Sequence, residues 1–257
     1  TGSSVLNPSR DLNGITLEAD IIFPQKPPKT SPFYFDTPFV KSSLFGFRYT
    51  TGEDDFDWTP ASPDISVYAI KEDRNSKNAY FELSSSYLDV VLTSSVFEDA
   101  YNDERWNFAV KVKNTSHLTG SSGSYTMEFQ GANSDGDRID NSFSLSHEFT
   151  SSAEILSTIT SGKRVYAGAL RTDTTGSVVE KADTRISAVR YWGKYLTEDT
   201  ILNHAKDATS YGVKDANRPL FGSNNDMPAI DTLQLYWGFD SVTTSSATGE
   251  FDILDIS

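Results

Sequence analysis

Two carboxylates stand at alternate positions of one apolar segment near the start of the chain. Glu18 and Asp20 lie within Gly14–Phe23, where apolar and polar residues alternate as in a β-strand. Alternation places both carboxylates on one face, where a nucleophile and a general acid of a glycoside hydrolase could act together. The next positions that could complete such a set hold Ile22 and Phe23. We therefore expect no hydrolase at this pair, and we interpret both side chains as part of a solvated strand face.

A second group of oxygen-bearing side chains lies in one loop. Asn133, Asp135, Asp137 and Asp140 stand at near-alternate spacing, and Ca²⁺ takes roughly six to eight oxygen ligands. Arg138 occupies the sixth place of this run, where an EF-hand loop requires Gly. An Asp-Gly pair between two alternating polar stretches is also typical of a hairpin turn. We favour the turn, with calcium at these four residues as the alternative and as the one cofactor that the sequence suggests.

A third group combines aromatic rings with carboxylates in Pro-flanked, loop-like sequence. Trp58 follows Asp57, and Tyr34 lies in an aromatic cluster between prolines. Sugars stack on exposed rings and hydrogen-bond to carboxylates, and such surfaces usually lie on loops. Trp58, Tyr34 and Asp57 are therefore candidate glycan-binding residues. The alternative is that these aromatic side chains pack beneath their loops as a satellite of the core.

Other chemistries lack their residues or their charge. The chain has no Cys and three histidines, His117, His147 and His204, none of which stands in a nucleophile or zinc motif. No Gly-rich loop opens a helix after a strand, so nucleotide binding has no support. Lys and Arg total 22 and Asp and Glu total 36, giving a net charge of −14, which argues against a nucleic-acid partner. No apolar run is long enough for membrane insertion.

The elements that must position these residues are mostly strands. Period-two alternation and turn residues at short intervals predict about ten strands and an all-β, two-sheet antiparallel jelly-roll sandwich of the concanavalin A-like class. The aromatic side chains of Phe45, Phe47, Trp106, Phe108 and Trp192 are expected in its core. The predicted strands are 14–23, 43–49, 65–71, 79–84, 88–93, 106–113, 125–130, 165–170, 186–192 and 233–239.

One short helix is expected in the C-terminal half. Thr197 is a suitable N-cap, and Glu198 and Asp199 follow it in the first turn, where negative charge suits the helix dipole. Leu196 and Ile201 flank the cap as a hydrophobic staple. We interpret His204, further along the helix, as a surface or packing residue. A weaker helical turn is predicted at 152–158.

The order of these segments resembles laminin-G-like domains of the concanavalin A-like lectin/glucanase superfamily. The resemblance covers about residues 13–212 and is strongest at 186–204, where a strand ending in an aromatic residue leads into a capped helix. It implies the fold, but not the function, because this fold carries lectins, glycanases, adhesion modules and virion parts. The segments that carry the resemblance are 15–23, 105–112, 166–170, 186–192, 194–201 and His204.

The C-terminal segment is similar to the opening strands of such a domain. Leu233–Asp240 and Gly249–Ile256 each carry alternating apolar residues. We expect a laminin-G-like domain over 1–212, followed over 213–257 by a linker and strands. These strands either complete the same sandwich or open a following repeat.

The function expected from these features is binding. The segment 204–212 with the strand after it is similar to modules in large virion proteins of tailed phages. We therefore expect a non-enzymatic module of a virion or tail-associated protein, whose partners are a host surface glycan and neighbouring domains or virion proteins. A secreted bacterial lectin-like adhesion module is the alternative, and a glycoside hydrolase the third hypothesis. The expected location is accordingly the virion or the extracellular space.

Overall fold

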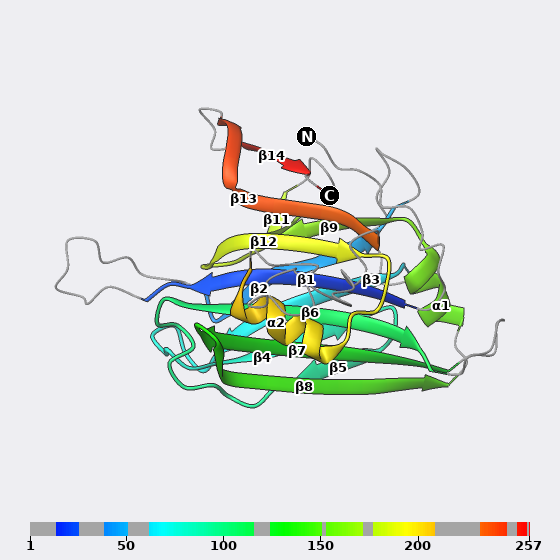
Figure 1. Ribbon diagram of the computed structural model, residues 1–257, viewed down its shortest axis with the longest axis horizontal. Coiled ribbons are helices and arrows are strands. Elements are labelled where there is room, and N and C mark those ends of the chain that lie inside the picture. Colours follow the sequence, from blue (N-terminus) through cyan, green and yellow to red (C-terminus); the bar gives the residue numbers. More distant parts are fainter. Residues whose placement is uncertain are drawn as a thin grey trace, which may run out of the picture.

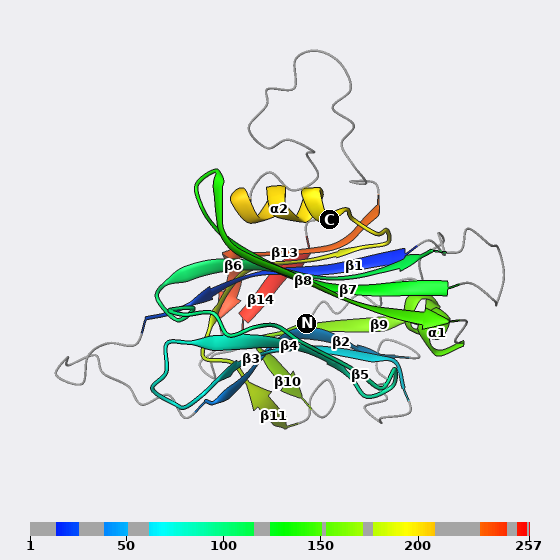
Figure 2. The ribbon, with the colours of Figure 1, turned by 90° about the horizontal axis from the view of Figure 1, so that it is seen from below.

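The chain forms a sandwich of two antiparallel β-sheets in the computed structural model (Figures 1 and 2). The structure describes residues 14–25, 39–50, 62–115, 124–150, 153–171, 177–208, 232–245, 251–255 and 257. The predicted all-β, two-sheet class is confirmed; its assignment to the concanavalin A-like superfamily stays a prediction. No helix in these ranges is long and apolar enough to cross a bilayer.

The elements are named in chain order. They are β1 (Gly14–Phe23), β2 (Lys41–Tyr49), β3 (Asp64–Lys71), β4 (Ala79–Ser85), β5 (Val90–Thr93), β6 (Glu104–Asn114), β7 (Ser124–Asp135), β8 (Arg138–Thr150), α1 (Ala153–Thr160), β9 (Lys163–Ala167), β10 (Ala169–Arg171), β11 (Val178–Lys181), β12 (Arg185–Trp192), α2 (Glu198–Lys206), β13 (Leu233–Ser245) and β14 (Phe251–Asp255).

The two layers differ in width. The large sheet has the strand order β14-β13-β12-β1-β6-β7-β8, and the small sheet has the order β5-β4-β3-β2-β9. Strand β13 pairs with β12 from Leu233 to Gly238, so the C-terminal segment adds its strands to the large sheet. Strands β10 and β11 form a separate ribbon.

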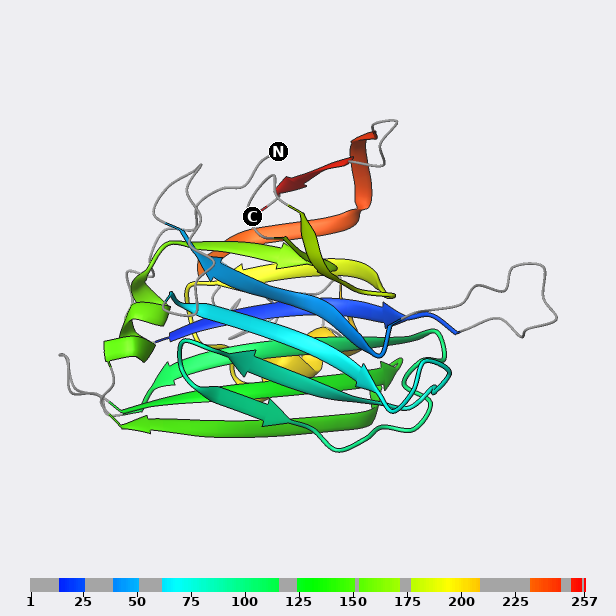
Figure 3. The same cartoon turned by 180° about the vertical axis from the view of Figure 1, so that it is seen from behind.

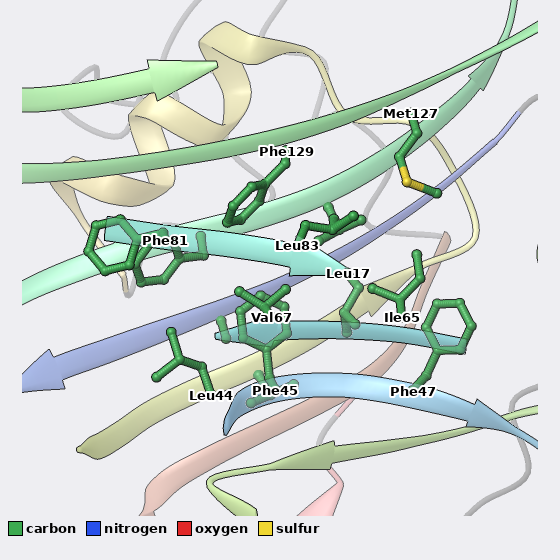
Figure 4. Packing of buried hydrophobic residues seen from close by; sticks show 14 of the residues in the cluster. Leu17, Leu44, Phe45, Phe47, Ile65, Val67, Phe81, Leu83, Met127 and Phe129 are labelled. Atoms are coloured by element: carbon green, nitrogen blue, oxygen red, sulfur yellow. The ribbon is translucent and has the colours of Figure 1, made fainter. Parts of the chain in front are cut away.

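Alternation along the strands builds the core between the layers. In β1, Ile15, Leu17 and Ala19 point inward and are buried. Side chains from both sheets meet them there, as Figure 4 shows for Leu17 and Val67. Burial of such apolar surface is the main force that holds the layers together. The aromatic residues expected in the core are all buried there or in a smaller cluster: Phe45, Phe47, Trp106, Phe108 and Trp192.

Two short helices, rather than one, occur in the described part of the chain. The predicted weak turn extends into helix α1, because Ile155 and Ile159 lie one turn apart and are both buried in the core. Helix α2 begins after Thr197 as predicted.

Three strands depart from the prediction. The predicted strand 165–170 is divided into β9 and β10 at Gly168, whose φ of +73° is strained for other residues. Strands β8 and β11 were not predicted.

Candidate functional site

Each sheet has an outer face, and each outer face is overlain by a different element. Helix α2 lies on the large sheet, and the ribbon β10–β11 lies on the small sheet beside β2 and β9 (Figures 2 and 3). We call these the helix-covered face and the ribbon-covered face. The helix-covered face comprises Glu18, Asp20, Arg105, Asn107, Lys111, Lys113, Glu128, Gln130 and Arg190. The ribbon-covered face comprises Lys41, Ser43, Arg48, Ser66, Tyr68, Tyr80, Glu82, Ser84, Thr93, Tyr166 and, from the ribbon, Glu180.

The helix α2 is fixed to its sheet at both ends. Just before its start, the Leu196 N–H donates to the Thr16 hydroxyl of β1 at 2.9 Å. The Thr197 hydroxyl then caps the helix by accepting from the Thr200 N–H at 3.4 Å. At its end, the Ala205 carbonyl accepts from the Ser134 hydroxyl at 2.7 Å and from the Arg105 guanidinium. Between these points, Ile201 packs into a buried cluster completed by Ala109, Trp192 and Leu196. The predicted cap and staple are thus confirmed.

A buried ionic cluster lies next to this helix. Glu18 accepts from Arg190 at 2.7 Å, and its other oxygen lies 2.9 Å from Nδ1 of His204. Asp20 lies 3.0 Å from the guanidinium of Arg105 and 3.2 Å from that of Arg190. The side chains of Glu18, Asp20 and His204 are all 0 % exposed. Arg190 therefore bridges two buried carboxylates.

The pKa values of the two carboxylates are shifted in opposite directions. Burial alone would raise the pKa of Glu18, but His204 and Arg190 outweigh it and lower this pKa to about 2. Burial also raises the pKa of Asp20, and there it prevails over Arg190 and Arg105, with the Glu18 charge adding to the rise. Such opposed pairs occur at acid–base sites and also in structural ion clusters.

The interpretation of this pair as a solvated strand face was wrong. Both carboxylates are fully buried, because helix α2 adds a third layer that strand alternation alone does not reveal. Burial also keeps both carboxylates from a substrate in this conformation, so the geometry gives a hydrolase at this pair no support. His204 is a packing residue: its ring stacks near Trp192, with 5.9 Å between centroids.

A second polar group continues along the helix-covered face. Lys111 is 0 % exposed and donates to Gln130 at 2.9 Å, while its ammonium lies 3.0 Å from Glu128. Glu128 also accepts from Lys113 at 2.7 Å and from the Tyr195 hydroxyl at 2.8 Å. Burial favours the neutral form of Glu128, yet these donors lower its pKa. This group binds strands β6 and β7 to the loop before α2.

The ribbon-covered face is built around tyrosines. The Tyr166 ring lies across Gly46, where an added Cβ would come within 2.6 Å of its hydroxyl oxygen. The Tyr166 hydroxyl donates to Ser66 at 3.0 Å. The absence of a side chain at Gly46 thus lets an aromatic ring lie flat on the sheet. Tyr166 itself is half-buried, with part of its surface exposed.

A charged pair adjoins these rings. The Lys41 ammonium lies 3.7 Å from the centroid of the Tyr68 ring and 3.2 Å from the Glu82 carboxylate. Glu82 lies opposite both Tyr68 and Thr93 in the sheet register. Tyr80, two residues from Glu82 on the same face of β4, is half-buried. Aromatic, carboxylate and hydroxyl groups therefore lie together on an accessible sheet surface.

The ribbon adds a carboxylate of which one oxygen lacks a donor. Burial raises the pKa of Tyr68, and the nearby Tyr166 and a hydrogen bond from the Tyr68 hydroxyl to Glu180 add to that rise. Among the described residues, Oε2 of Glu180 and Oγ of Ser43 are buried without a hydrogen-bond partner. Ser43 lies opposite Tyr68 in the register. The pattern that identifies this face is tyrosine at outward positions of the predicted strands, which we had not interpreted as a site.

The proposed calcium loop forms the β7–β8 hairpin. Asp135 pairs with Arg138 across the turn, and Gly136 has φ +57°, so the favoured turn is confirmed. Asp140 lies 2.7 Å from Arg138, and the Asn133 side chain binds the Asn141 N–H at 2.8 Å. No three Asp, Glu or His side chains gather as metal ligands in the described ranges. Calcium at Asn133, Asp135, Asp137 and Asp140 stays a prediction, tested by whether added calcium raises the melting temperature.

The three glycan-binding residues predicted from sequence lie outside the described residues. They are Tyr34, Asp57 and Trp58, and their part in binding stays a prediction.

Comparison with known proteins finds similarity of structure but none of sequence. No protein-family model matches the chain, and no curated protein matches it in sequence. Similar solved structures include the enzymatically active domain of tailspike protein 2 of bacteriophage CBA120, at 9 % identity and TM-score 0.44, covering 80 % of this chain and 25 % of that one. The CBM40 of a Ruminococcus gnavus sialidase follows at 15 % identity and TM-score 0.33, covering 78 % and 91 %. Scytalido-glutamic peptidase shows 12 % identity and TM-score 0.32, covering 75 % and 79 %.

The expectation of a non-enzymatic module is contradicted by this comparison. Two of the similar structures are described as an enzymatically active domain and as a peptidase. The expectation rested on an incomplete carboxylate motif and on the lack of nucleophile and zinc motifs, whereas catalytic groups on a sandwich can come from several strands and loops. The absence of that motif therefore does not exclude an enzyme.

Proposed function

We propose that this chain binds a glycan on the ribbon-covered face. The observation that carries the proposal is the group of side chains Tyr80, Glu82 and Thr93 on the neighbouring strands β4 and β5 of one outer sheet surface. Tyr68 on β3 lies opposite Glu82, and half-buried Tyr166 lies further along the same face, on β9. Tyrosine offers an apolar ring and a polar tip, which suits a sugar's C–H face and hydroxyl groups. Tyr34, Asp57 and Trp58 are included in the proposal on their sequence alone.

The polar neighbours give the surface its hydrogen-bonding capacity. Glu82 is already oriented by Lys41 at 3.2 Å, so one carboxylate oxygen is held in place to accept from sugar hydroxyls. Ser84 and Thr93 offer hydroxyls that both donate and accept. A few positioned polar groups around aromatic rings are the usual composition of a small-ligand surface.

The proposed setting is a virion or tail-associated protein of a phage, where this face contacts host surface glycan. The resemblance of the segment from His204 onward to modules of large virion proteins supports this setting. A secreted bacterial lectin-like module is the alternative. Neighbouring genes of the full-length reading frame distinguish the two, because phage genes support the first and a secretion signal supports the second.

Binding is tested by screening the chain on a glycan array and titrating the hits by calorimetry. Tyr80→Ala should weaken binding about tenfold, the scale of one aromatic contact. Tyr195→Ala is the matched control, since it also removes a half-buried tyrosine but from the helix-covered face, and it should leave affinity unchanged.

Melting curves of both variants check that the fold is retained. Equal losses of affinity in Tyr80→Ala and Tyr195→Ala would place the binding site elsewhere. Binding to no glycan on the array would overturn the proposal. Chromatography of the titrated mixtures also shows whether the glycan is cleaved.

A further inference from the structure

The ribbon β10–β11 is attached to the sandwich more weakly than the strands beneath it. Its strands pair with each other at only three positions and are not part of the small sheet's hydrogen-bonded ladder. The Gly168 N–H donates to the Leu44 carbonyl at 2.7 Å at one end. At the other end, Asp183 binds Ser42 and Lys71, both at 2.7 Å. The ribbon is therefore anchored at its base, and Glu180 lies between these anchors in sequence.

The contact between the ribbon and the sheet leaves two buried oxygen atoms without a partner. Oε2 of Glu180 and the hydroxyl oxygen of Ser43 have no hydrogen-bond partner among the described residues and are closed to solvent, although the Tyr68 hydroxyl donates to the Glu180 carboxylate. A buried polar group without a partner costs about 1–3 kcal/mol. A ligand with hydroxyl donors would remove this cost once the ribbon shifts to admit it.

The charges of this face disfavour an anionic ligand. Lys41 is paired with Glu82 at 3.2 Å, and Arg48 with Asp64 at 3.0 Å. Glu180 adds a negative charge beside the tyrosines, and the chain as a whole carries −14. A carboxylate or sulfate on a sugar would meet repulsion where a hydroxyl meets an acceptor.

We infer that Glu180 sets the ligand class of this site: it accepts hydrogen bonds from the hydroxyl groups of a neutral glycan and excludes glycans that carry carboxylate or sulfate. This inference rests on the proposed glycan-binding function and names the specificity-determining residue for it.

The test compares matched neutral and anionic ligands. The pairs are lactose and sialyllactose, galacto- and galacturono-oligosaccharides, and a glucan and its sulfated form. In each pair that binds, calorimetry should give the neutral member an affinity at least about tenfold higher than that of the anionic member. Glu180→Gln keeps the shape of the side chain and removes its charge. It should reduce that preference to about threefold or less. Glu72→Gln removes an exposed carboxylate beyond β3 and should leave the preference unchanged.

The outcomes separate the two proposals. Equal or tighter binding of the anionic member, or a preference that survives Glu180→Gln, overturns the inference and leaves glycan binding intact. Failure of every pair and of the glycan array overturns both. A preference that falls equally in Glu72→Gln shows a general charge effect and also overturns the role of Glu180.

Discussion

The two outer faces of the sandwich carry similar residue types under different covers. On the helix-covered face, Glu18 and Asp20 are fully buried and bridged by Arg190. On the ribbon-covered face, Tyr80 and Tyr166 remain partly exposed, and Oε2 of Glu180 is buried without a hydrogen-bond partner among the described residues. The covering element thus determines whether the polar outer face of a sheet is buried or stays accessible to a ligand.

The difference follows from what each cover brings with it. Helix α2 brings His204 to Glu18, and its Ala205 carbonyl accepts from Arg105, so the ionic groups that it buries gain partners. The ribbon brings an acceptor to a face that already holds Ser43, and neither unsatisfied atom finds a donor in the described structure. The helix-covered face also holds buried atoms without a hydrogen-bond partner, Oδ1 of Asn107 and Nε2 of Gln130. The two faces therefore differ in how their charges are paired and not in whether every polar atom is satisfied.

The largest effect that we predict is on the helix-covered face. Arg190→Leu leaves two buried carboxylates without their shared cation, and it should lower the free energy of unfolding by about 3–5 kcal/mol. Denaturant melts at neutral pH measure this loss. The matched control is Arg138→Leu, whose pair with Asp140 is exposed and is worth about 0–1 kcal/mol. Losses of equal size would show that the buried cluster stabilises the fold no more than an exposed ion pair does.

A second prediction concerns the loss of folding stability at acid pH. Glu18 has a native pKa of about 2, below its ordinary value of 4.5, so the native state binds this proton more weakly than the unfolded state. The resulting stability, about 3 kcal/mol, is fully present above pH 4.5 and lost as the pH falls toward 2. Asp20 acts in the opposite direction, because its native pKa is raised.

Comparison of wild type with Glu18→Gln isolates the Glu18 contribution. The variant is less stable at neutral pH, and the gap between the two proteins should narrow as the pH falls from about 4.5 toward 2. Glu148→Gln, at an exposed position on β8, should follow wild type throughout. A gap that stays constant with pH would show that Glu18 is not held ionised by its neighbours.

Much of the fold follows from local sequence signals. Alternation in 14–23 gives β1 and its inward face, and Thr197 with Leu196 and Ile201 gives the start of α2. Strand β8 was missed although Phe143, Leu145 and Phe149 alternate with polar residues, a pattern of the same period as in β1.

The candidate site depends on contacts that no local pattern contains. Burial of Glu18 requires His204, which is 186 positions away in the chain. The tyrosine face requires the register of β2, β3 and β9, which places Gly46 beside both Ser66 and Tyr166. Such pairings are fixed by packing over the whole sandwich, and a single sequence records only the alternation that permits them.

The smallest predicted effect has the opposite sign and completes the comparison. Removing a charge from the helix-covered face destabilises the protein, because that charge is paired. Glu180→Gln removes a buried charge whose Oε2 has no partner in the described structure, and it keeps an amide oxygen that can accept from the Tyr68 hydroxyl as Glu180 does. It should therefore raise the free energy of unfolding by about 0.5–1 kcal/mol. Denaturant melts without ligand measure this, with Glu72→Gln as the exposed control. A loss of stability in Glu180→Gln would mean that the carboxylate is satisfied in solution, and the two faces would then differ in exposure alone.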